Sequence, residues 1–278
     1  MIKNFLLSIF LLLIPSCFWG NTAYRPQVSV AGFIPLSGSG RDIYNFNPGW
    51  RYYKGDMERA ETVELDDSDW EVVATPHSVE LMPAEASGCR NYQGPVWYRK
   101  WFVIPAATRG KQVFIHFEAV MGKQKVYLNG HLVKEHLGGY LPFNIDLTAN
   151  GIQAGDSCLI AVMADNSDDK SYPPGKRQYT LDFSYHGGIY RDVWMIAKSD
   201  VSITDAVDAG KVAGGGVFIH YGRISEKKAD ILIDTEVRNN GKRQRKVEVE
   251  SSLVDATGTL IKRVVAMVHL DAGQSKTV

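Results

Sequence analysis

Short runs of alternating apolar and polar residues, separated by turn residues, restrict the fold of this chain more than any other feature. Within one such run, Val113, Ile115 and Phe117 alternate with Phe114 and His116. A period of two places successive side chains on opposite faces of a β-strand. Beyond residue 20, no stretch of ten or more residues shows the i, i+3, i+4, i+7 pattern of an amphipathic helix. The chain is therefore predicted to be all-β.

The residues between these runs indicate how the strands are connected. Lys125–Val133 is predicted to be a hairpin, because Asn129-Gly130 supplies the positive φ angles of a type I′ turn. Leu159–Met163 has the continuous apolar character of a buried strand, and Val193–Ile196 closes another. Many strands at close spacing, with Gly, Pro, Asn and Asp turns between them, predict a β-sandwich.

The composition changes near residue 198. None of the six Trp lies after Trp194, and none of the eleven Pro lies after Pro174. The segment beyond the boundary holds further alternating strands and a turn, at residues 231–237, 239–241, 247–251 and 260–268. We count about five strands, whereas an immunoglobulin-like sandwich has about seven. Residues 199–278 are therefore predicted to form an incomplete immunoglobulin-like sandwich.

The first residues are predicted to be an export signal. Lys3 precedes an apolar run over residues 5–14, which is short for a membrane span, so residues 1–16 fit a signal peptide. Ile14-Pro15-Ser16-Cys17 resembles a bacterial lipoprotein box, in which Cys17 would be acylated; the alternative is ordinary cleavage, for example after Gly20. In both cases we expect an exported protein, in the periplasm or on the outer membrane of a Gram-negative bacterium.

Charge and cysteine content exclude several function classes. The chain has 31 basic and 31 acidic residues, so it has no positive field for a nucleic-acid backbone. No zinc-ligand spacing and no nucleophile motif with Ser, His and Asp is present, so we expect no metal, no cofactor and no serine hydrolase. For Cys89 and Cys158, two unpaired thiols are favoured over a disulfide.

Several segments together resemble the N-terminal part of glycoside hydrolase family 2, the family of β-galactosidases, β-glucuronidases and β-mannosidases. They occur in the family's order: Asn47-Pro48-Gly49-Trp50, Asp66–Trp70, Pro76-His77, Val96–Phe102, Val126–Gly130, Glu135–Phe143, Asp146–Thr148, Asp165-Asn166 and Gly187–Trp194. The resemblance implies that residues 45–198 form a sugar-binding jelly-roll sandwich, galactose-binding-like, with residues 17–44 as an N-terminal linker and first strand.

The sequence departs from the family in two respects. Pro76-His77 is followed by Ser78-Val79, where the family often has Asp-Trp. In the family, catalysis occurs in a (β/α)₈ barrel after the second sandwich, and such a barrel needs about 250 residues by itself. We therefore expect that residues 1–278 alone do not hydrolyse glycosides, and that the missing barrel is their partner.

The resemblance implies a function for the intact enzyme. The chain would be the non-catalytic N-terminal portion of an exported retaining exo-β-glycosidase of the β-galactosidase type, acting on a terminal β-linked sugar. The alternative is a lipid-anchored carbohydrate-binding or adhesion module without hydrolase activity. Reading the gene past codon 278 separates the two.

The candidate sugar-binding residues follow from the same resemblance. In the β-galactosidase branch, an Asp near the offset of Asp182 from Gly187 reaches the active-site pocket, and a carboxylate can accept two hydroxyl hydrogen bonds. The loop Asn91-Tyr92-Gln93 edges the pocket in the family. The alternative is that Asp182 is a solvated loop residue and that the other three have structural roles.

Other motifs favour structural roles. Arg99 is expected to bind a carboxylate within the sandwich, and both Tyr140 and Phe143 to pack in its core rather than to form an aromatic platform for a sugar. The acidic run Asp165–Asp169 is expected to be a solvated turn rather than a Ca²⁺ site.

Overall fold

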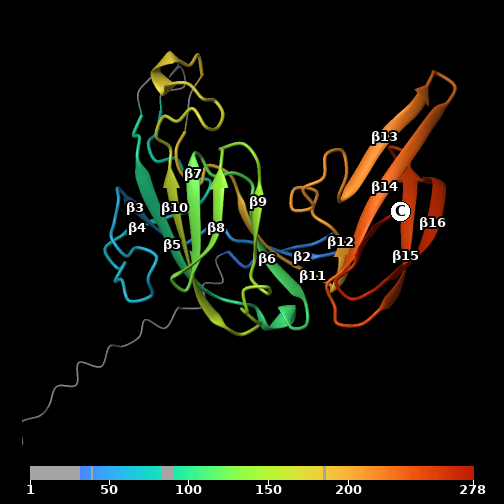
Figure 1. The fold of residues 1–278 in the computed structure, drawn as a ribbon, viewed down its shortest axis with the longest axis horizontal. Coiled ribbons are helices and arrows are strands. Elements are labelled where there is room, and N and C mark those ends of the chain that lie inside the picture. Colours follow the sequence, from blue (N-terminus) through green and yellow to red (C-terminus); the bar gives the residue numbers. More distant parts are fainter. Residues whose placement is uncertain (1–31, 39, 83–90, 184–185) are drawn as a thin grey trace, which may run out of the picture.

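The structure, a computed structural model, describes residues 32–38, 40–82, 91–183 and 186–278 (Figure 1). Within these ranges the chain is built from strands β1–β17 and two single-turn 3₁₀ helices, η1 (Ala106–Thr108) and η2 (Gln178–Thr180). The all-β prediction is confirmed. The described residues include no helix with the length and apolarity that a membrane span needs.

Two antiparallel sheets form the first sandwich (Figure 1). One sheet has the order β1 (Pro35–Leu36), β2 (Asp42–Asn45), β11 (Val193–Lys198), β6 (Gln112–Phe117) and β9 (Phe143–Asp146). The other has the order β4 (Glu71–Val73), β3 (Trp50–Lys54), β5 (Pro95–Val103), β10 (Ser157–Asp165), β7 (Lys123–Leu128) and β8 (His131–Leu137).

The core between these sheets contains the inward positions that the alternation predicts. On β6, Val113, Ile115 and Phe117 are buried, and Phe114 and His116 lie on the outer face. The ring of Phe117 stacks on Phe143 at 4.9 Å between centroids, so Phe143 is a core residue, as expected. The same expectation for Tyr140 is wrong, because its side chain lies on the connection before β9 and is 43% exposed. Trp50 is fully buried in the same core.

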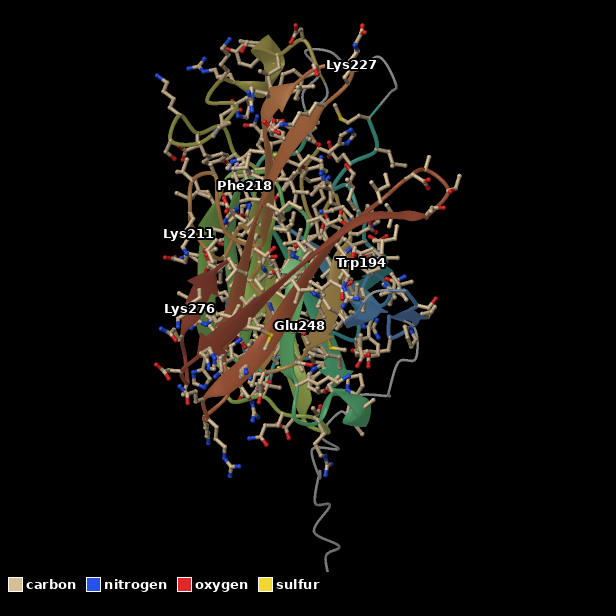
Figure 2. All side chains as sticks on the ribbon, turned by 90° about the vertical axis from the view of Figure 1, so that its right-hand side faces the viewer. Trp194, Lys211, Phe218, Lys227, Glu248 and Lys276 are labelled. Carbon is tan, nitrogen blue, oxygen red and sulfur yellow. The ribbon has the colours of Figure 1, made fainter. Side chains whose placement is uncertain are left out.

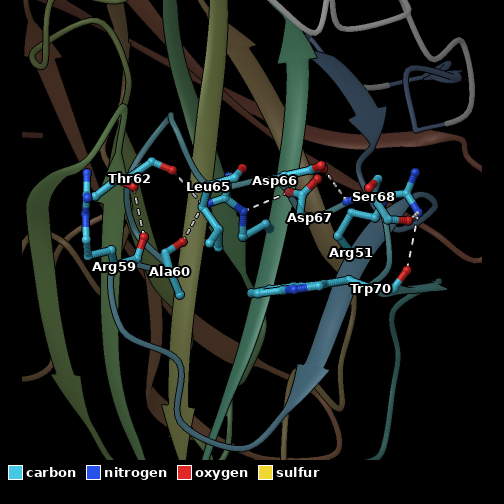
Figure 3. Close-up of polar contacts among 10 residues, drawn as sticks. Arg51, Arg59, Ala60, Thr62, Leu65, Asp66, Asp67, Ser68 and Trp70 are labelled. Carbon is cyan, nitrogen blue, oxygen red and sulfur yellow. Dashed lines mark hydrogen bonds and ion pairs between the residues drawn. The ribbon is translucent and has the colours of Figure 1, made fainter. Parts of the chain in front are cut away.

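The outer face of the six-stranded sheet is covered by the loop over residues 55–70 (Figure 3). The buried Arg99 side chain on β5 pairs with Asp67 at 2.7 Å. Its guanidinium also donates to the carbonyl oxygens of Ala60, Thr62 and Leu65. The expected structural role of Arg99 is confirmed, and the loop is held against the sheet at four points.

The strands after residue 200 form two smaller sheets. One joins β12 (Val201–Ile203), β14 (Ala229–Asn239) and β13 (Val217–Ile224), and β17 (Ser275–Thr277) also pairs with β14; the other is the hairpin of β15 (Arg245–Val254) and β16 (Leu260–Leu270). Figure 2 looks at these strands, with Phe218 on β13 and Glu248 on β15, in front of the first sandwich. Six strands are present, where the sequence suggested about five. The predicted domain boundaries stay a prediction.

The core of these smaller sheets is slight. Its buried members are Val237, Val268 and Leu270, with Val201, Val247 and Val249 packed against them. Many other apolar side chains on the same strands are exposed, among them Val217, Ile219, Tyr221, Leu260, Val264 and Met267.

Candidate functional site

Loops from several strands meet at one end of the first sandwich. β5 begins where β10 ends, because Pro95 is paired with Asp165, and β7 begins beside the same residue through Lys123. The segments 91–94 and 166–183 therefore leave the sheet side by side; the second is the yellow loop region above β10 in Figure 1. Residues 186–190 join them, since Tyr190 packs against Leu181 and Met121.

Asn166 connects these loops through its side chain, which is almost fully buried. Its amide nitrogen donates to the Tyr92 carbonyl oxygen at 2.8 Å and to Oδ1 of Asn91 at 3.3 Å. Its amide oxygen accepts from the backbone of Gly94 at 3.2 Å. An amide that both donates and accepts suits this task. In the sequence, Asn166 stands out only as part of the family pattern, from which this role could not be predicted.

Asp168 extends the connection to the 3₁₀ helix η2. Its Oδ1 accepts from the Gln93 side chain at 3.1 Å and from the Gln178 backbone at 3.0 Å. Gln178 in turn donates from its side chain to the Asn166 carbonyl oxygen at 2.8 Å. The loop that carries Asn91, Tyr92 and Gln93 is therefore tied to the segment that precedes Asp182.

Asp182 is exposed and directly follows Leu181, which packs against Met121 and Tyr190. Its carboxylate has no hydrogen bond or ion pair to any residue that the structure describes. The structure thus brings Asp182 to the same end of the sandwich as the Asn91–Gln93 loop. The packing of Leu181 anchors its backbone, and its side chain is exposed to solvent. A carboxylate in this state is available to accept hydroxyl hydrogen bonds.

The other three predicted residues differ in how far their side chains are already engaged by neighbouring residues and could still contact a sugar. Tyr92 is largely occupied: its hydroxyl donates to the Pro95 carbonyl oxygen at 2.9 Å, and the Lys54 ammonium lies 4.9 Å from its ring centroid. Asn91 is half-buried against Asn166. Gln93 is exposed, and its amide bonds to Asp168. Tyr92 and Asn91 therefore have the structural contacts of the alternative interpretation, whereas Gln93 faces solvent.

The acidic run is a turn at the surface, with Asp168 exposed and Asp165 and Asp169 partly buried, and hydrogen bonds tie it into this loop cluster. Asp169 forms an ion pair with Lys123 at 2.6 Å, and hydrogen bonds from Lys123 and Ser171 hold the pKa of Asp169 well below its usual range. Asp165 accepts from Ser167 through both backbone and side chain. No group of three or more metal-ligating side chains is present in the described part of the chain.

A second strip of loop packs beside this cluster. The His77 amide donates to the Ile189 carbonyl oxygen at 2.8 Å, and His77 Nδ1 lies 2.9 Å from the Tyr98 hydroxyl. Desolvation lowers the pKa of His77. Gly188 has φ +89°, and a Cβ there would lie 2.2 Å from the Tyr98 hydroxyl oxygen, so only glycine fits.

Ser78 and His186 are near each other in this strip but are not arranged for catalysis. Ser78 Oγ lies 3.0 Å from His186 Nδ1 and donates its proton to the Glu80 carbonyl oxygen at 2.6 Å. A nucleophilic serine instead gives its proton to a histidine base. Cys17, the predicted lipidation site, and Cys89 lie outside the described residues.

Comparison with known proteins matches this part of the chain to one family. Residues 45–199 match the model of the glycosyl hydrolases family 2, sugar binding domain. The chain is 34% identical to a β-galactosidase of Thermoanaerobacter pseudethanolicus over 84% of its own length and 31% of that protein. It is 30% identical to a β-glucuronidase of Formosa agariphila over 87% of its length and 26% of that protein.

Solved structures agree with these matches. A β-glucuronidase 2 of Bacteroides uniformis superposes with a TM-score of 0.75 at 28% identity, covering 86% of this chain and 27% of that one. The putative β-galactosidase of Bacteroides fragilis gives a TM-score of 0.72 at 29% identity, covering 86% of this chain and 34% of that one. The chain thus spans about a third or less of the proteins it resembles.

Proposed function

Because this chain belongs to glycoside hydrolase family 2, we propose that it is the N-terminal, sugar-binding part of an exported retaining exo-β-glycosidase of the β-galactosidase type. The intact enzyme would release a terminal β-linked sugar. The two carboxyl groups that retaining hydrolysis needs, about 5 Å apart, would come from the barrel that the family places after the second sandwich.

The observation that carries this proposal is the anchored loop cluster around Asn166. Hydrogen bonds fix the Asn91–Gln93 loop and η2 to one another, and Asp182 extends from this fixed base as an exposed carboxylate that bonds to none of the described residues. A rigid support is what a sugar-positioning residue needs, because binding energy is lost when a contact group must first be ordered. Asp182 would accept hydrogen bonds from the hydroxyls of the sugar in the pocket, and Gln93 would line its edge.

The charge of Asp182 also bears on the sugar. Among the relatives, both β-galactosidases and β-glucuronidases occur. A carboxylate accepts hydrogen bonds from a neutral sugar, whereas it repels the carboxylate of a glucuronide. This favours a neutral β-galactoside as the substrate.

The test begins with the gene beyond codon 278 and continues with the intact enzyme. We expect a barrel with its glutamates and turnover of a chromogenic β-galactoside. Asp182→Asn should lower kcat/KM by about 10- to 100-fold, the loss expected for hydrogen bonds to a charged group. Asp69→Asn is the matched control, because Asp69 is also exposed and bonds to no described residue.

Three outcomes would contradict the proposal. A stop after codon 278 would favour the lipid-anchored binding or adhesion module, which glycan-array binding would then test. An unchanged kcat/KM for Asp182→Asn would remove Asp182 from the pocket. A preference for the β-glucuronide over the β-galactoside would reverse the assignment of the sugar.

We also propose that the protein is exported and that Cys17 carries a lipid. Metabolic labelling with a radioactive fatty acid should mark the wild-type protein and not the Cys17→Ser variant. Labelling of the variant would contradict the anchor, and retention of an uncleaved precursor in the cytoplasm would contradict export.

A further inference from the structure

A groove lies between the first sandwich and the strands that follow it. Its volume is about 440 Å³. Phe114, Asn144, Asp146 and Lys198 line one wall, and the other wall includes Asp208 and Arg238. None of the residues proposed above for the sugar pocket takes part. Small-molecule sites commonly have volumes of about 300–1,000 Å³.

The strand period explains why this groove is polar. On β9, Phe143 and Ile145 point into the core, so Asn144 and Asp146 stand on the outer face. Phe114 on β6 and Lys198 at the end of β11 face outward by the same alternation. The loop after β12 lies opposite (Figure 1), and Asp208 from it accepts a hydrogen bond from the Asn144 amide at 2.7 Å.

Burial partly desolvates Lys198 and Asp146, whereas Asp208 and Arg238 are exposed. Lys198 Nζ lies 4.5 Å from the Phe114 ring centroid. No carboxylate of the described chain is within ion-pair distance of Lys198 or Arg238. Burial lowers the pKa of Lys198 and raises the pKa of Asp146. Titratable groups perturbed in this way and facing one concavity are typical of binding sites.

The mixture of groups selects the chemistry of the ligand. Lys198, Arg238 and the Asn144 amide are donors, whereas Asp146 and Asp208 are acceptors. A single ion could bind only to the donors or only to the acceptors. Each hydroxyl of a sugar can both donate and accept a hydrogen bond, so a sugar can bind to both kinds of group. The Phe114 ring offers a surface for the apolar CH face of a sugar. Asp205 and Glu236 also line the groove, so it has four carboxylates and two cations. This excess of negative charge disfavours an anionic sugar.

We propose that this groove is a second carbohydrate site, which binds a neutral mono- or disaccharide between the two sandwiches. The Asn144–Asp208 hydrogen bond already joins the walls, and a bound sugar would add contacts to both. Binding would therefore hold the two parts of the chain together. This site is independent of the proposed catalytic pocket, because it uses other residues at another place in the fold.

The test is a calorimetric titration of the full chain with galactose, glucose and lactose, and with glucuronate as the anionic probe. We expect saturable binding of at least one neutral sugar with a Kd of about 1 mM, and weaker binding of glucuronate. Arg238→Ala and Lys198→Met should each weaken that binding about tenfold, the loss of one hydrogen bond to a charged group. The side chain of Arg238 has no hydrogen bond or ion pair in the described chain, so Arg238→Ala should keep the wild-type melting temperature.

Asp182→Ala is the control, because it alters the loop cluster and leaves the groove intact. Binding that persists unchanged in both groove variants would overturn the proposal. So would binding lost in Asp182→Ala alone, which would place the sugar at the loop cluster and leave the proposed function standing. Absence of saturable heat with all three neutral sugars at about 50 times the expected Kd would overturn it as well.

Discussion

The two parts of this molecule use the same sequence pattern with different results. On β6, every second residue is apolar and fully buried between two sheets. On β16, Val268 and Leu270 are buried, but Val264, which shares their face, is 57% exposed. Alternation therefore predicts a strand in both regions. It predicts a core only where a second layer covers the strand.

The test with the largest expected effect on stability shortens one side chain to alanine in each region. Trp50→Ala in the first sandwich should lower the free energy of unfolding by about 3–5 kcal/mol, because a large buried ring is replaced by a cavity. Leu260→Ala, at a half-exposed site, should change it by no more than about 0.5 kcal/mol. Urea unfolding followed by far-UV circular dichroism measures both.

Equal losses of unfolding free energy for the two variants would contradict the difference between the two regions, since they would mean that Leu260 is buried in solution. If Trp50→Ala does not fold, Ile115→Val gives a milder measurement at a fully buried site, with an expected loss of about 1 kcal/mol.

The second test compares an ion pair in each region. Asp67→Ala leaves the fully buried Arg99 guanidinium without its carboxylate and should cost about 3 kcal/mol. Glu250→Ala removes the partner of Arg263, in a pair whose side chains are 44% and 51% exposed, and should cost less than about 1 kcal/mol. Chemical denaturation measures both losses. A cost for Asp67→Ala no larger than that of Glu250→Ala would show that the carbonyl oxygens alone hold Arg99.

The third test compares two glycines with the same backbone conformation. Gly188 has φ +89°, and a Cβ added to it would lie 2.2 Å from the Tyr98 hydroxyl oxygen, whereas Gly258 has φ +85° with open space around it. Gly258→Ala should cost about 1 kcal/mol, the penalty of a left-handed alanine. Gly188→Ala should cost about 1 kcal/mol or more in addition, from overpacking. Thermal melts that rank the two variants equally would contradict the close approach at Gly188.

The last test measures a pH dependence and concerns a buried lysine that only the first sandwich has among the described residues. Lys100 donates to the carbonyl oxygens of Phe46 and Pro48 and lacks a carboxylate partner in the described chain, and burial lowers its pKa to about 7. The unfolded chain, with a lysine pKa of about 10.4, then binds more protons than the folded chain above pH 7. Stability should therefore rise with pH, by about 1 kcal/mol per unit at most, between pH 7 and about pH 10.

Denaturation at several pH values measures this slope. Lys100→Met should remove it, and the exposed Lys262→Met is the control that should keep it. A slope that survives Lys100→Met would assign the effect to other groups.

Sequence reasoning predicted the strands better than it predicted their surroundings. Alternation correctly identified the buried face of β6, because a strand covered on one side reads as apolar and polar in turn. It did not identify Lys100 as a core residue, because β5 is covered on both faces and its buried positions include two charged side chains. The cover itself, the 55–70 loop, has no strand or helix pattern from which its position could be predicted.

The candidate site was predictable only in part, for a similar reason. Asp182 and the Asn91–Gln93 loop came from the family resemblance, and the structure brings them to one end of the sandwich. The contact that unites the loops, between Asn166 and Gly94, spans 72 positions in the sequence. No local pattern encodes a hydrogen bond of that range.

The hydrogen bonds of Asn166 limit which segments of such a protein can be exchanged, both by recombination during evolution and by grafting in the laboratory. Two segments that are distant in the sequence, 91–94 and 166–178, are joined by the side chain and carbonyl of Asn166, so neither can be exchanged alone without leaving a buried polar group unsatisfied. A graft intended to alter sugar preference would have to transfer the segments around residues 91–94 and 166–182 as one unit. Recombination between relatives would preserve function most often when its crossovers leave that unit whole.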